Sequence, residues 1–103
     1  MYTLNITSKV QHDITDDWIQ WQKTKNIPAM MGTGLFSKYH FSHLLDHDDE
    51  DGKTFILQFT IPSLDEYETF LQNHDDNFRK SAFHLWGDRF LAFRTLFETL
   101  KMS

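Results

Sequence analysis

Four stretches of the chain alternate apolar and polar residues with a period of two, which is typical of strands that bury one face. The third stretch is the most apolar, so we expect it near the centre of a sheet. An acidic segment before it ends in Asp51-Gly52, which is a hairpin signal. The predicted strands cover residues 2–10, 35–45, 53–61 and 89–100.

Two further stretches place apolar residues three and four positions apart, which is the spacing of a helix with one buried stripe. The first predicted helix begins near Ile14, and Asp13 is positioned to cap it. Proline lacks a backbone N–H and clashes with the preceding turn of a helix. We therefore expect Pro28 to break this helix or to start a new short turn near residue 26 or 27.

The second predicted helix begins with a capping box, in which Ser63 is the cap and Glu66 reaches back to it. A polar interruption over residues 73–77 predicts a kink or a restart of the helix. Gly87 ends the apolar stripe and predicts the end of the helix, because glycine readily adopts the left-handed conformation that is common at this position.

The order of these elements, βαββαβ, predicts one α+β domain over residues 1–103 with the ferredoxin-like fold. In this fold, right-handed crossovers place both helices on one face of a four-stranded antiparallel sheet. The residues expected on the helix side are mostly large and apolar, so we expect a filled core with little cavity volume. They are Leu4, Ile6, Phe55, Leu57, Phe59, Leu91 and Phe93.

The opposite face of the sheet is predicted to mix apolar and polar residues and to pair with a second copy of the chain. A monomer with a solvated sheet is the alternative. Arg94 would then need an acidic partner such as Glu98 or a residue of the second copy, or it could hold an anionic ligand. The residues expected at the dimer interface are Ile56, Gln58, Ala92, Arg94 and Leu96.

Composition and charge narrow the classes of partner. Acidic residues outnumber basic ones by 15 to 10, and the net charge is −5, so the chain would repel the phosphates of nucleic acids. The absence of cysteine excludes disulfides and thiolate metal sites. No apolar run approaches the roughly 20 residues of a membrane helix, and no signal peptide is evident at the start. We therefore expect a cytosolic protein without membrane or nucleic-acid partners.

Two segments resemble a bacterial family known as domain of unknown function 4286. They are Ile27-Pro28 followed by Thr33-Gly34-Leu35-Phe36, and Gly87-Asp88-Arg89-Phe90-Leu91-Ala92-Phe93-Arg94-Thr95. The resemblance extends over essentially the whole chain and implies a dimeric α/β barrel. It brings no established activity. The wider superfamily includes cofactor-independent monooxygenases, haem-degrading enzymes and stress-response proteins, so the fold alone does not assign a function.

Several side chains are candidates for a pocket between the helices and the sheet. In haem-binding relatives of the superfamily, a helical histidine ligates the iron, which makes His74 a candidate; a structural role at the helix interruption is the alternative. Aromatic side chains could line a pocket for a flat ligand, although aromatics at helical spacing more often form the core. The aromatic candidates are Trp18, Trp21, Tyr39 and Trp86.

No metal site is expected. His40 and His43 point to opposite faces of a strand, and the acidic segment 46–51 does not match the spacing of a calcium loop.

Taken together, the features of the sequence favour a non-catalytic homodimer that binds a small molecule or a protein partner, with no cofactor. The alternatives are an oxygenase that is cofactor-independent or haem-dependent, and a structural dimer connected with stress.

Overall fold

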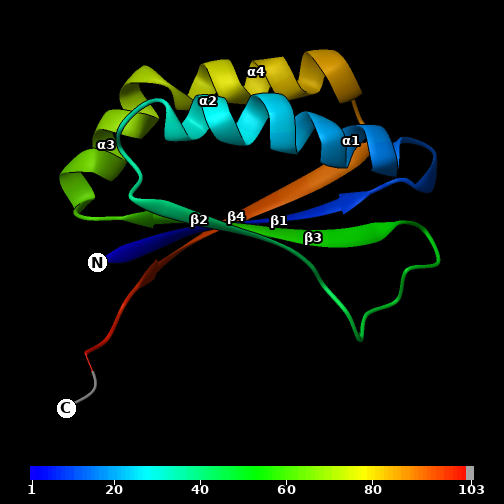
Figure 1. Ribbon diagram of the computed structural model, residues 1–103, viewed down its shortest axis with the longest axis horizontal. Helices are drawn as coiled ribbons and strands as arrows, with labels where there is room; N and C mark the ends of the chain where they lie inside the picture. Colours follow the sequence, from blue (N-terminus) through cyan, green and yellow to red (C-terminus); the bar gives the residue numbers. More distant parts are fainter. Residues whose placement is uncertain (102–103) are drawn as a thin grey trace.

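The computed structural model describes residues 1–101 and contains a four-stranded antiparallel sheet whose one face is covered by helices (Figure 1). The order of the strands is β2-β3-β1-β4, and each pair of neighbours is antiparallel. The sheet is open, with β2 and β4 at its edges. The strands are β1 (Tyr2–Val10), β2 (Lys38–His43), β3 (Lys53–Ile61) and β4 (Phe90–Glu98).

The first helical region is continuous. Just before Pro28 it changes from a π-helical to an α-helical segment. Pro28 falls in the first turn of α2, where a missing N–H is tolerated. The predicted new turn is therefore confirmed, but the helical region is not interrupted there. Asp13 does not cap this region as predicted, because it lies within η1, which begins at His12. Its carboxylate pairs with Arg89 at 2.8 Å. The successive segments are η1 (His12–Ile14), α1 (Thr15–Trp21), the π-helical η2 (Gln22–Asn26) and α2 (Ile27–Met31).

The second helical region consists of α3 (Leu64–Asn73) and α4 (Asp75–Trp86), which meet at the predicted interruption. It ends at Gly87 as predicted, with a positive φ of 59° that glycine adopts readily, although its ψ of −131° differs from that of the left-handed helical conformation. The Ser63 hydroxyl donates a hydrogen bond to the Glu66 carboxylate, and this bond lowers the pKa of Glu66. Ser63 bonds no helical N–H through its side chain, so the capping box forms only in part.

The core consists of two clusters between the helices and the sheet. The larger cluster packs α2 and α3 against the centre of the sheet, and the smaller cluster packs α1 against one end of β1 and β3. The larger cluster contains Leu4, Ile27, Met30, Phe36, Leu57, Phe59, Ile61 and Phe70, and the smaller contains Val10, Ile14, Trp18 and Phe55.

None of the helices within residues 1–101 combines the length and the apolar character that crossing a bilayer requires.

The faces of β4 are the reverse of the sequence prediction. Directly paired residues of neighbouring strands share a face, and Arg94 pairs with Ile6, which faces the helices. The predicted placement is therefore wrong: Ala92, Arg94 and Leu96 lie on the helix side, and Leu91 and Phe93 lie on the open face. The segment from Phe90 to Phe93 is apolar at every position, so alternation alone could not determine its faces, whereas pairing with β1 does.

Gly52 occupies a position that has no room for a side chain. Its φ is 156°, and an added Cβ would lie 2.4 Å from the Val10 carbonyl oxygen. We expect Gly52→Ala to lower the free energy of unfolding by about 2–3 kcal/mol, measured by urea denaturation. Gly34→Ala is the control, since Gly34 also has a positive φ of 77° but open space around it. Its expected loss is only about 1 kcal/mol, and equal losses would contradict the steric explanation.

Candidate ligand pocket

A cavity of about 430 Å³ lies between the helices and the sheet, over β1 and β4. This cavity contradicts the filled core that the sequence predicts. Three of the ten phenylalanines, Phe83, Phe93 and Phe97, are exposed and do not contribute to the core. On this side of the sheet, the small residues Ser8 and Ala92 are paired with each other across β1 and β4, and they leave space above the strands.

The walls of the cavity are mainly apolar and come from three parts of the chain. The floor is formed by β1, β3 and β4, one wall by the region from α1 to α2, and the other wall by α4. The apolar lining residues are Ile6, Trp21, Met30, Leu57, Phe78, Ala82, Phe83, Phe90 and Ala92, and the polar ones are Ser8, Gln22, Asn26, Arg79, Asp88 and Arg94. Gly87 and Leu91 also border the cavity, although the side chain of Leu91 lies on the open face.

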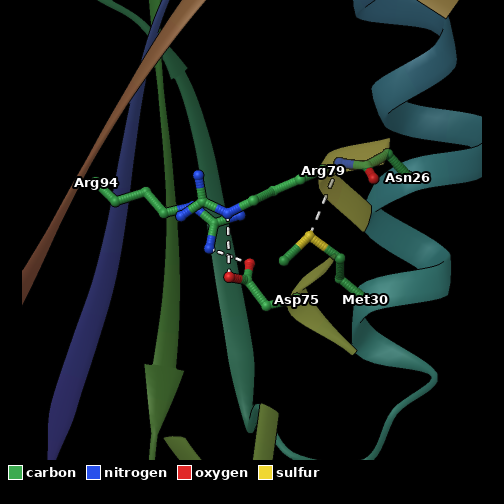
Figure 2. A network of polar contacts seen from close by, with 5 residues as sticks. All are labelled: Asn26, Met30, Asp75, Arg79 and Arg94. Carbon is green, nitrogen blue, oxygen red and sulfur yellow. Dashed lines mark hydrogen bonds and ion pairs between the residues drawn. The ribbon is translucent and has the colours of Figure 1, made fainter. Parts of the chain in front are cut away.

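Two arginines of the lining converge on one carboxylate (Figure 2). Arg94, on β4, donates to one oxygen of Asp75 through Nη1. Arg79, one turn along α4 from Asp75, donates to the other oxygen through Nε at 3.1 Å. The side chains of Asp75 and Arg94 are only 13% and 21% exposed, so this ion pair is largely shielded from water, whereas Arg79 is 59% exposed. Two guanidinium groups share one carboxylate, which leaves one positive charge in excess.

The π-helical segment η2 supplies the polar part of the opposite wall. The Asn26 amide donates to the side-chain oxygen of Gln22 at 2.8 Å and lies 3.8 Å from the sulfur of Met30. Figure 2 shows the contact between Asn26 and Met30 beside the two arginines. Single π-helical turns within helices are often found at functional sites. Here, the turn places two amide side chains on the cavity.

Of the three tryptophan candidates, Trp21 lines the cavity. Trp86 packs edge-on against it, with ring centroids 5.9 Å apart, and is not part of the lining. Trp18 is 1% exposed and belongs to the smaller core cluster. The alternative that aromatics at helical spacing form core therefore holds for Trp18.

His74 and Tyr39 lie away from the cavity lining. His74 is at the junction of α3 and α4, where its ring stacks on Phe70 with centroids 6.4 Å apart. Its backbone N–H donates to the carbonyl of Phe70, and its carbonyl accepts from Phe78, which agrees with the structural role at the helix interruption. Tyr39, on the edge strand β2, is 48% exposed.

Arg94 has a different partner and a different place from those predicted. It pairs with Asp75 within the chain. Sequence analysis missed Asp75, Arg79, Gln22 and Asn26 as site residues. The spacing of Asp75 and Arg79 by four residues indicates a pair on one helix face, but nothing in the sequence indicates that this face meets β4.

The acidic segment between β2 and β3 is bound to neighbouring histidines through Asp49. His43 lies 3.7 Å from its carboxylate, and His12 lies 2.7 Å from its carbonyl oxygen. Across residues 1–101, no three acidic or histidine side chains are grouped so that they could hold a metal ion.

One family model matches residues 1–100 of the chain, which is nearly its whole length. Its description is "Domain of unknown function (DUF4286)". No curated protein matches the chain in sequence.

Proposed function

The chain belongs to the DUF4286 family, whose description names no activity, and we propose that it is a non-catalytic protein that binds a small, mainly apolar molecule. The observation that carries this proposal is the cavity of about 430 Å³ between the helices and the sheet. Its volume lies within the usual range for small-molecule sites, roughly 300–1,000 Å³. Mainly apolar walls with a few polar groups are also typical of such sites.

The oxygenase alternative has less support. Haem iron needs an axial ligand, and the residues that line the cavity include no histidine. His74, the candidate for that role, stacks on Phe70 at the helix junction instead. A cofactor-independent oxygenase would use the same cavity, but no arrangement of side chains favours it over simple binding.

The proposal includes a second copy of the chain, seated on the open face of the sheet. The element order and the strand order β2-β3-β1-β4 support the ferredoxin-like class, in which two open sheets can stack as a dimeric barrel. The open face carries Leu91, Phe93 and Phe97, which are 59%, 66% and 46% exposed. Ile56 lies two strands away, because both Ile56 and Phe93 pair with Thr7. These four residues form the apolar patch of the interface.

Charge on this face permits a two-fold contact. Although the chain has a net charge of −5, the strands place no carboxylate on the open face, and its two lysines, Lys9 and Lys38, lie near the ends of β1 and β2. Each residue near a two-fold axis lies close to its own copy, so carboxylates there would repel each other. The neutral amides at the centre already have partners: Gln58 donates to Asn5, and Asn5 donates to Thr95. Burying these bonded groups costs little.

The size of the open face also fits a dimer. Three strands of nine residues and one of six cover roughly 550 Å² in projection. Side chains make the accessible area larger than this projection. The face therefore approaches the roughly 800 Å² per partner of a standard interface.

The cavity is tested by filling it. Naphthalene-2-carboxamide is a neutral probe of suitable size, and we expect it to bind the wild-type protein in a calorimetric titration. In Ala82→Trp, the new ring would occupy the cavity, and we expect at least a tenfold weaker binding of the probe.

Ser81→Trp is the matched control, since Ser81 is the exposed neighbour of Ala82 on α4. It should bind the probe as the wild type does. Equal binding by Ala82→Trp and Ser81→Trp, or no binding by the wild type at millimolar probe, would overturn the proposed function.

A further inference from the structure

The ligand cavity has an electrostatic polarity. One end contains Arg94 and Arg79, which share the single carboxylate of Asp75. At the other end, beyond the last turn of α4, Asp88 lines the cavity, and it forms no ion pair within residues 1–101. Arg79 lies seven residues before the last residue of α4, which corresponds to about 10 Å along the helix, and Asp88 follows that end. A ligand with one charged group would therefore meet attraction at one end and repulsion at the other.

At the arginine end, Arg94 and Asp75 are shielded from water, while Arg79 is more exposed. The Arg94 side chain is 21% exposed and that of Asp75 is 13% exposed, and charges in such surroundings interact more strongly than charges in water. Asp75 occupies only part of the donor capacity of the two guanidinium groups, since each carries five N–H donors in a rigid fork. Donors of this geometry match a carboxylate well.

The shape and the walls of the cavity set the rest of the ligand. A volume of about 430 Å³ lies toward the lower end of the roughly 300–1,000 Å³ range of small-molecule sites, so it accepts one small organic molecule. Trp21, Met30 and Phe78 offer apolar contacts on both walls. The space between them suits an aromatic ring or a short alkyl chain.

We propose, on the basis of the proposed function, that the ligand is a small carboxylic acid with an apolar body, held by Arg94 and Arg79. Its carboxylate would compete with Asp75 for the guanidinium groups, and its body would lie between Trp21 and Phe78. One negative charge balances the one positive charge in excess, whereas a doubly charged phosphate would leave one charge without compensation. Asp75 is therefore a positioning residue that orients the arginines and limits the affinity.

Naphthalene-2-carboxylate tests this inference against the neutral carboxamide of the same shape. We expect the wild-type protein to bind the carboxylate about tenfold more tightly, because it adds charge-assisted hydrogen bonds. In Arg94→Gln, Asp75 and Arg79 form a neutral pair, so the carboxylate should lose its advantage over the carboxamide. In Asp75→Asn, both guanidinium groups become available, and the carboxylate should bind more tightly than to the wild type.

The affinity for the carboxylate is expected to fall in Arg94→Gln and to rise in Asp75→Asn, so the test stays decisive if one of these variants folds poorly. Arg79→Gln, at an exposed position, is a further variant. Equal affinity of the wild type for both probes, or a preference that survives Arg94→Gln, would overturn the inference and leave the proposed function intact. Tighter binding of naphthyl phosphate than of the carboxylate would also overturn it. Failure of both naphthalene probes to bind would overturn the inference and the proposed function together.

Discussion

Phe93→Glu is expected to convert the proposed dimer into a monomer. Phe93 is 66% exposed in the single chain and lies on the open face of the sheet, in the middle of β4. In a two-fold dimer the substitution acts twice, since each copy loses an aromatic contact and gains a carboxylate in an apolar interface. The expected cost is about 4 kcal/mol or more per dimer, which corresponds to roughly a thousandfold increase in Kd.

Light scattering at micromolar concentration measures this effect. The wild-type protein should have twice the 12.3 kDa mass of the chain, and Phe93→Glu should have the mass of one chain. Leu85→Glu is the matched control, because Leu85 is 51% exposed on α4, away from the open face. It should remain dimeric. A wild-type particle of 12.3 kDa would contradict the dimer, and a monomeric Leu85→Glu would place the interface on the helices.

Trp18→Ala is expected to cause the largest loss of stability. Trp18 is 1% exposed, and its ring lies 5.3 Å from that of Phe55 and 5.9 Å from that of Phe41. Removing it would leave a large void in the smaller core cluster, and large-to-small changes of this kind cost about 3–5 kcal/mol. A domain of this size has a total stability of about 5–15 kcal/mol, so the variant would be marginal at best.

Comparing Trp21→Ala with Trp18→Ala tests whether Trp21 lines the cavity while Trp18 belongs to the core. Trp21 is only partly buried and already borders empty space, so its removal should cost less than half as much as that of Trp18. Urea denaturation measures both losses. Equal losses would contradict the assignment of Trp21 to the cavity wall and of Trp18 to the core.

The order and the bounds of most elements could be predicted from the sequence because they depend on local signals. Alternation identifies β1 and β3, and α4 ends at Gly87, where glycine readily adopts the positive φ. The start of α2 at Ile27 follows from the rigid ring of Pro28. Each of these features rests on interactions within a few residues of chain, which any fold must satisfy.

The placement of the functional side chains, in contrast, depends on contacts between distant segments. Because β4 is apolar on both faces over its first half, pairing with β1 was needed to place Arg94 toward the helices and Phe93 toward the open face. Only the docking of α4 over β4 brings Asp75 to Arg94, 19 residues apart in the chain. The cavity arises in the same way, since several phenylalanines point outward and leave the helix side less filled than their number suggests. The sequence alone therefore determined the elements, and the tertiary structure decided which face of β4 is the site and which is the candidate interface.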